Sequence, residues 1–241
     1  MLNIAKDVVK CIPGVMSIYR RVQERRERIR LEGMPAEEVF TEMFVNNETE
    51  GEDGPHWAGS DRIQTRNVVA ELPSILREVG ATTIVDAGCG DFYWMQNVDL
   101  SGFDYLGVDI VRLLVERNGS KFETDRIRFK QLDLLTQPVP RADVVLCRDV
   151  FVHFSYKDMA RALANIRQSG SKYLLATTYT AVRRNQDITT GWWRKLNLEQ
   201  APLNLPKPER VFVEGCTEVG GANADKSLAL WRLSDIGGNR P

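Results

Sequence analysis

The chain has 241 residues, of which 43% are hydrophobic and 27% charged, and its formal net charge is −1. This length fits one domain with some elaboration and is enough to bury a sizeable core. The near-neutral charge gives no electrostatic reason to expect nucleic acid as a partner, and no apolar run reaches the ~18 residues of a membrane-spanning helix.

The four cysteines, Cys11, Cys89, Cys147 and Cys216, lie far apart in the sequence. No pair has the spacing of a metal site or a redox motif. We therefore expect a reducing compartment, with the cytoplasm as the default. The sequence contains no internal repeat and no low-complexity tract.

Residues 1–30 combine an apolar helical face with an arginine cluster. Ala5, Val8 and Ile12 share one face of a helix, and six arginines follow between positions 20 and 30. A signal peptide is not expected, because the charges follow the apolar part and no small-residue cleavage site appears. Two interpretations stay open: a helix lying on a membrane surface, which would make the protein membrane-associated, and a helix packing on its own domain or on a second subunit in a homodimer. We favour packing, since arginine-rich faces are usually solvated.

The hydrophobic period changes near residue 80. Residues 34–45 and 62–80 have the period of helices, with loop-forming residues 46–54 between them. After that, short apolar runs predict strands at 82–86, 105–110, 127–132, 143–147 and 172–178. Residues 157–168 form a helix candidate, and the runs 210–215 and 227–233 predict a terminal antiparallel hairpin.

This alternation predicts an α/β fold, a doubly wound, mostly parallel, seven-stranded sheet with helices on both faces. We divide the chain into a helical N-terminal extension, residues 1–80, and a core, residues 81–241. The hairpin is expected at the edge of the sheet.

The first predicted strand ends in Asp86 and turns through Gly88 and Gly90. Glycines allow the backbone to approach a ligand closely, and ligands of open α/β sheets bind beyond the carboxyl ends of the strands. Tyr93 occupies the third glycine position of a dinucleotide fingerprint, which disfavours NAD and FAD. The turn also lacks the G-K-[ST] ending of a phosphate-binding P-loop.

Four segments in order resemble the class I S-adenosylmethionine (SAM)-dependent methyltransferases. They are "DAGCG" (86–90), "YLGVD" ending at Asp109, "KQLDLL" with Asp133, and "VVLCRDVFVHF" with His153. The resemblance covers about residues 80–235 and implies a Rossmann-like methyltransferase fold with SAM as cofactor. The segments "CGDFYWM" and "GWWRKLNLEQAPLNLPKP" look like a branch of bacterial small-molecule and glycan methyltransferases.

The resemblance also implies roles in cofactor binding. Asp86 would attract the amine, Asp109 would accept both ribose hydroxyls, and Asp133 would face the adenine amine. Gly88 and Gly90 would meet the methionine portion, and Leu134 would offer its backbone N–H to the ring. The remaining implied contacts are Cys89, Ile110 and Arg148. The alternative is that the three acids only form turns at strand ends.

Methyl transfer to a hydroxyl requires a general base or a metal. His153 follows the fourth strand, and Asp149 lies four residues earlier, within reach of the imidazole if the segment is a helical turn. We predict His153 as the base and Asp149 as its orienting partner, with His56 as the second candidate base. A metal held by Asp149 with Asp187 or Asn185 is an alternative that we disfavour, so no metal is predicted.

Aromatic residues and a long irregular segment suggest where an acceptor binds. Residues 185–208 show no clear period, which is typical of a lid or binding loop. The predicted acceptor-binding residues are Tyr93, Trp94, His56, Asn185, Trp192 and Trp193. For the aromatics after the glycine turn, packing into the core is the alternative.

The sequence thus predicts a SAM-dependent O-methyltransferase that acts on a hydroxyl of a sugar, a glycolipid or another small metabolite. An N-methyltransferase is one alternative, since an amine needs no strong base. A non-catalytic binding protein that keeps the fold is another. Nucleic acid is not expected as a substrate, because no Asn-Pro-Pro-Tyr-type tetrapeptide follows the fourth strand.

Overall fold

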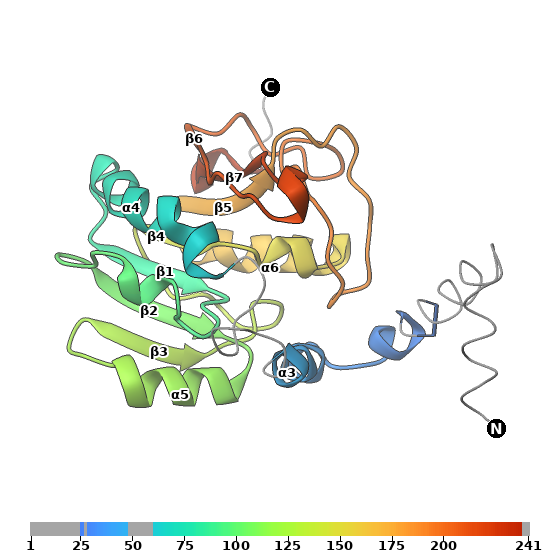
Figure 1. Cartoon of the computed structure of the whole chain (residues 1–241), viewed down its shortest axis with the longest axis horizontal. Coiled ribbons are helices and arrows are strands. Elements are labelled where there is room, and N and C mark those ends of the chain that lie inside the picture. Colours follow the sequence, from blue (N-terminus) through green and yellow to red (C-terminus); the bar gives the residue numbers. More distant parts are fainter. Residues whose placement is uncertain (1–24, 27, 48–59, 238–241) are drawn as a thin grey trace. The chain divides into compact units, whose positions relative to one another are not determined.

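The computed structural model describes residues 25–26, 28–47 and 60–237 (Figure 1). The chain forms two compact units, residues 1–35 and 36–241. In the described part of the first unit, Arg25, Arg26 and residues 28–32 are helical. The predictions for residues 1–24 and for His56 lie outside the described residues, and the functional division at residue 80 stays a prediction. No helix within the described ranges combines the length and the apolar character needed to cross a bilayer.

The second unit contains one seven-stranded sheet in the order β3-β2-β1-β4-β5-β7-β6. The strands are β1 (Thr83–Ala87), β2 (Asp104–Asp109), β3 (Ile127–Gln131), β4 (Val144–Cys147), β5 (Tyr173–Tyr179), β6 (Arg210–Val213) and β7 (Lys226–Arg232). The first five are parallel, and β7 runs antiparallel to both of its neighbours. The predicted fold class is therefore confirmed, including the terminal antiparallel hairpin, whose second strand lies inside the sheet and whose first strand forms the edge.

The described residues of this unit form four α-helices: α3 (Ala36–Asn47), α4 (Arg62–Glu78), α5 (Arg112–Phe122) and α6 (Tyr156–Gln168). The helix α5 was not singled out by the sequence pattern. It packs against β2 and β3 at one end of the sheet (Figure 1). Asp61 is the N-cap of α4, and its carboxylate accepts from the N–H groups of Ile63 and Gln64 at 2.7 and 2.9 Å.

Alternate residues of β1 show how the two faces are covered. Val85 belongs to a core cluster that contains Met159 of α6, whereas Ile84 belongs to one that contains Leu72 of α4. Successive side chains of a strand point to opposite faces, so α4 and α6 cover opposite sides of the sheet. Every residue of β4 and β5 is buried, which explains why these strands appear in the sequence as continuous apolar runs.

The topology gathers several chain segments at one edge of the sheet. The carboxyl ends of β1, β2, β4 and β5 meet there because these strands are parallel. The antiparallel β7 begins at the same edge, where Lys226 pairs with Tyr179 at the end of β5. Residues that follow parallel strands and the residue that opens β7 thus lie close together.

Candidate active site

A cavity of about 1070 Å³ lies at this edge of the sheet. The predicted residues that line it are Gly88, Cys89, Gly90, Trp94, Asp109, Ile110, Asp133, Leu134, Arg148, Asp149, His153 and Trp193. The helix α3 also contributes to the wall through Ala36, Phe40 and Met43. Ligand pockets usually measure about 300–1,000 Å³, so this volume accommodates a cofactor together with a second molecule.

The turn after β1 has the backbone that its glycines suggest. Gly88 and Gly90 have φ values of 79° and 58°, in the region that favours glycine. A Cβ atom at Gly88 would lie 2.5 Å from Cγ2 of Val150, whereas one at Gly90 would meet nothing within 4 Å. The turn is therefore packed against Val150 at Gly88 and open at Gly90, where a ligand could approach the backbone.

Phe92 continues this turn with a φ of 60°, an unusual conformation for a bulky residue. Its ring is buried between Tyr105, Phe122 and Phe129, with centroid distances of 5.3, 5.1 and 5.1 Å. Aromatic burial on this scale compensates for the backbone strain. For Phe92 the core interpretation is thus the correct one, and its ring fixes the course of the glycine turn.

Asp109, at the end of β2, holds two loops together. One carboxylate oxygen accepts from Gly90 N–H at 3.0 Å, and the other accepts from Val111 N–H at 2.9 Å. Burial raises the pKa of Asp109, although these N–H donors oppose the shift. The backbone N–H of Ile110 also bonds this carboxylate, so of the about four acceptor positions of an ionised carboxylate one remains for a ligand hydroxyl.

Asp133 and Leu134 follow β3 and line the cavity. The Asp133 carboxylate accepts from Leu135 N–H and from the Thr136 hydroxyl, at 2.8 and 2.7 Å. Leu134 is buried, and its carbonyl accepts from Asn165 at 2.8 Å. No acceptor for its N–H is found among the described residues, so this backbone donor on the cavity wall can bind a ligand or water. This wall fits the edge of a nitrogen heterocycle.

Asp86 lies beneath the turn and does not line the cavity. Its carboxylate is buried and accepts from the Tyr105 hydroxyl at 2.6 Å. Burial raises its pKa to about 7, against the opposing effect of the Tyr105 hydrogen bond. The structure therefore places Asp86 behind the turn, bonded to Tyr105, and its carboxylate does not line the cavity where the resemblance placed it to attract the amine.

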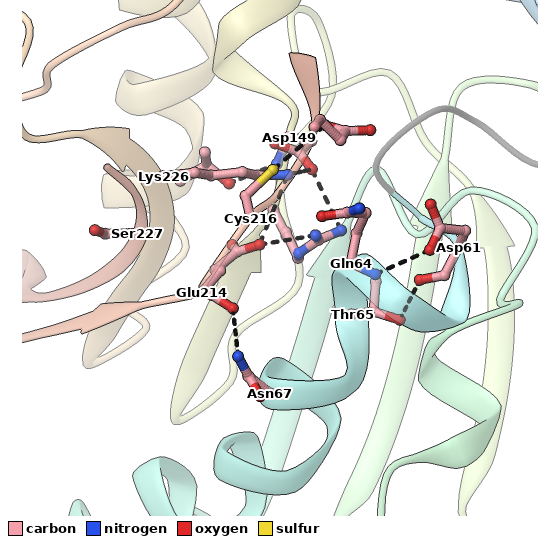
Figure 2. A network of polar contacts seen from close by, with 12 residues as sticks. Asp61, Gln64, Thr65, Asn67, Asp149, Glu214, Cys216, Lys226 and Ser227 are labelled. Carbon is pink, nitrogen blue, oxygen red and sulfur yellow. Dashed lines mark hydrogen bonds and ion pairs between the residues drawn. The ribbon is translucent and has the colours of Figure 1, made fainter. Parts of the chain in front are cut away.

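Four charged side chains form a quartet on the floor of the site, which we call the buried quartet: Arg148, Glu214 and Lys226 are buried, and Asp149 is 26% exposed. Arg148 pairs with Glu214 at 2.8 Å and with Asp149 at 3.3 Å. Lys226 approaches Asp149 to 2.6 Å and Glu214 to 3.6 Å (Figure 2). The side chains of Arg148, Lys226 and Glu214 are 3%, 3% and 1% exposed. Such burial is tolerated because two positive and two negative charges compensate each other.

Within the quartet, Asp149 and Arg148 pair with each other. They also pair with Glu214, which follows β6, and with Lys226, which begins β7. Asp149 has a φ of 59°, and its N–H donates to the Thr177 hydroxyl at 2.8 Å. Burial alone would raise the pKa of Asp149, but Lys226 and Arg148 outweigh it and hold the pKa below its usual range. Arg148 also lies 5.1 Å from the centroid of the Trp94 ring. Its predicted contact with a cofactor is therefore secondary to its role in the quartet.

His153 lines the cavity, but its ring is oriented differently from the prediction. Its Nδ1 lies 3.2 Å from the Trp192 carbonyl, which can only accept, so Nδ1 carries the proton and Nε2 the lone pair. Burial lowers the pKa of His153, while the nearby Asp149 charge opposes this shift. The prediction that Asp149 orients the ring is thus wrong, because the Asp149 carboxylate is held by Lys226 and Arg148. The charge of Asp149 still favours an imidazolium at His153.

Three predicted acceptor-binding residues do not line the cavity. Asn185 is buried, and its side-chain amide bonds both the N–H and the carbonyl of Asn197, so it fixes the 185–208 segment internally. Trp192 contributes its carbonyl to His153, and Tyr93 lies beside Arg62, 5.8 Å from the ring centroid. Within the described ranges, no group of three His, Cys, Asp or Glu side chains is arranged to hold a metal ion.

The sequence prediction missed Tyr179 and Lys226, which both line the cavity. Burial raises the pKa of Tyr179, so its hydroxyl keeps its proton at neutral pH. Tyr179 ends the fifth parallel strand, so strand polarity alone places it at the ligand edge. Lys226 could have been found only by recognising that an antiparallel strand begins where its parallel neighbours end.

The comparisons with known proteins agree with this geometry. A family model described as a methyltransferase domain matches residues 46–206, which is more than half of the chain. The chain therefore belongs to the methyltransferase-domain family, and its class is that of the SAM-dependent methyltransferases. No curated protein matches it.

Solved structures share the fold at low sequence identity. Magnesium protoporphyrin IX methyltransferase from Synechocystis PCC 6803 with bound SAM aligns with a TM-score of 0.58 and 15% identity over 83% of this chain and 97% of that chain. Human N-acetylserotonin methyltransferase in complex with SAM aligns with a TM-score of 0.58 and 16% identity, over 89% of this chain and 66% of that chain. The N-methyltransferase NodS from Bradyrhizobium japonicum WM9 with S-adenosylhomocysteine (SAH) aligns with a TM-score of 0.57 and 14% identity, over 80% of this chain and 97% of that chain. The first two of these proteins are named for acceptors of different chemistry and the third is an N-methyltransferase, so the shared fold does not specify the acceptor.

Proposed function

We propose that this protein is a SAM-dependent O-methyltransferase that acts on a hydroxyl of a small metabolite, a sugar or a glycolipid. The observation that carries the choice of a hydroxyl is His153, a neutral imidazole on the cavity wall whose Nδ1–H is fixed by the Trp192 carbonyl. An alcohol attacks poorly unless its proton is removed, and a positioned base contributes about 10²–10⁴-fold to such a step.

The residues that would hold the cofactor are those with acceptor or donor capacity left over. Asp109 has an acceptor position left for a ribose hydroxyl, and Leu134 has an N–H for the adenine ring. Gly90 leaves the backbone open for the methionine portion. When bound, SAM supplies an electrophilic methyl group on a sulfonium.

The chain's own residues would then handle the proton. The Nε2 lone pair of His153 accepts the proton of the acceptor hydroxyl as the oxygen attacks, and the ring becomes an imidazolium. The ionised Asp149 stabilises that positive charge without direct contact, because Lys226 and Arg148 keep it deprotonated. The Trp192 carbonyl keeps the ring from rotating during the transfer.

The test is an acceptor screen with purified protein that scores SAH release, followed by His153→Ala on the best acceptor. Turnover should fall about 10²–10⁴-fold while SAH affinity stays nearly unchanged, since the base touches the acceptor and not the nucleoside. Amine acceptors methylated at full rate by His153→Ala would favour the N-methyltransferase alternative. Complete loss of activity with a chelator, restored by Mg²⁺, would replace the histidine base by a metal.

A further inference from the structure

Three large apolar side chains stand exposed around the mouth of the cavity. Ile63, Trp193 and Val219 are 63%, 47% and 78% exposed, and all three line the cavity. They make up three of the eight exposed large apolar residues in the described part of the chain. Single apolar residues on a surface are ordinary, but a cluster at a binding site indicates a ligand with apolar surface. We refer to these three residues as the apolar rim.

The three residues of the rim are far apart in the sequence, but hydrogen bonds join the segments that carry them. Gln64, next to Ile63, donates to the Thr217 hydroxyl at 2.9 Å. Lys195, near Trp193, bonds the Ala222 carbonyl. Residues 217–222, which include Val219, therefore connect the start of α4 to the segment that carries Trp193. Trp193 in turn packs edge-on against Tyr179, with a centroid distance of 6.1 Å.

Val219 has an unfavourable backbone for an exposed apolar residue. Its φ is 52°, and the following Gly220 and Gly221 have φ values of 61° and 84°. A β-branched residue in the left-handed region is strained, and nothing in the protein core repays it because the side chain is exposed. Strain retained at the mouth of a site suggests that the side chain serves a ligand.

The charged residues of the cavity wall restrict the charge that the ligand can carry. Six acids and three bases are found among the described lining residues: Asp61, Asp91, Asp109, Asp133, Asp149, Glu218, Arg62, Arg148 and Lys226. Both Lys226 and Arg148 are already compensated within the buried quartet. This excess of acids disfavours an acceptor that carries a carboxylate or a phosphate near the reacting hydroxyl.

We infer that the acceptor is a neutral amphiphile, whose hydroxyl lies at His153 and whose alkyl or aryl part rests on the apolar rim. This inference rests on the proposed function and specifies its acceptor class. The volume of about 1070 Å³ leaves room for such a molecule beside the cofactor.

The experiment compares two neutral probes with the same polar group, methyl and octyl β-D-glucopyranoside, titrated below the micelle concentration into SAH-saturated protein. Octyl glucoside should bind at least about 10-fold more tightly, since burial of two methylene groups already accounts for that factor. Ile63→Gln and Val219→Asn should each remove much of this preference. Asparagine tolerates a positive φ, so the second variant should be no less stable than the parent. Val211→Ser, which changes an exposed valine on the edge strand β6, is the matched control and should keep the preference.

Calorimetry with SAH alone separates this inference from the proposed function. Protein that binds no SAH would overturn the proposed function itself. Normal SAH binding with equal affinities for the two probes would overturn only the amphiphile inference. Sedimentation showing a dimer that Ile63→Gln or Val219→Asn dissociates would assign the rim to a second copy of the chain and also overturn it.

Discussion

Removing Glu214 from the buried quartet should destabilise the protein strongly. Glu214 and Arg148 are 1% and 3% exposed and lie 2.8 Å apart, so Glu214→Ala removes the nearest carboxylate from a buried guanidinium, which must then share Asp149 with Lys226. Deleting one partner of a buried pair typically costs about 3–5 kcal/mol. In a domain of this size that loss corresponds to a fall in Tm of about 6–20 °C.

Urea unfolding followed by circular dichroism measures this loss, provided that the slope of the transition stays unchanged. Glu209→Ala is the matched control. The distance between Glu209 and Arg232, 2.9 Å, is similar to that between Glu214 and Arg148, but the side chains of Glu209 and Arg232 are 41% and 47% exposed. This exposed pair should contribute no more than about 1 kcal/mol. A double variant, Arg148→Met with Glu214→Leu, should recover much of the stability that Glu214→Ala loses. If Glu214→Ala and Glu209→Ala destabilise the protein equally, the reasoning about the quartet is refuted.

Three further predictions concern the acids and the base of the site. Burial raises the pKa of Asp86 to about 7. Between pH 4 and 7 the folded state therefore keeps a proton that the unfolded chain has released. The free energy of unfolding should fall as pH rises through this window. Asp86→Asn should abolish that fall and gain up to about 4 kcal/mol over the parent at pH 8 in urea melts, whereas parallel pH profiles would contradict the shift. Because burial lowers the pKa of His153, kcat/KM should rise with pH through an apparent pKa below 6.5 and then level off, and the rise should be absent in His153→Ala. Asp109→Ala should weaken SAH binding by about 1–3 kcal/mol in calorimetry, with the exposed Asp104→Ala on the same strand as control; equal affinities would remove Asp109 from the cofactor site.

The sequence predicted the parts of the site that depend on strand polarity. The glycine turn, Asp109, Asp133 and His153 follow parallel strands, and parallel strands present their carboxyl ends at one edge. Apolar runs at β4 and β5 were recognisable because both faces of these strands are buried. This part of the prediction needs only local pattern and topology.

Long-range pairing was not predictable in the same way. The partner of Asp149 is Lys226, 77 residues away, and no local pattern distinguishes it from other lysines. The assumption of a helical turn from Asp149 to His153 failed because Asp149 takes a positive φ and only residues 151–153 are helical, in one short 3-10 turn. Asn185 looked like a binding residue because it lies in an irregular segment, yet that segment is held by internal hydrogen bonds to Asn197.

The position of β7 has a consequence for the synthesis of the protein. This strand is the last of the seven in the sequence, yet it lies between β5 and β6 and brings Lys226 to the quartet. During translation, β6 is synthesised before its neighbour β7, and Arg148, Asp149 and Glu214 are made before the lysine that completes their charge balance. The first five strands can pair in the order in which they appear, but the edge that carries the site can close only after residues 226–232 have emerged. Ribosome stalling before that point would leave a nascent chain with a formed parallel sheet and an incomplete active site.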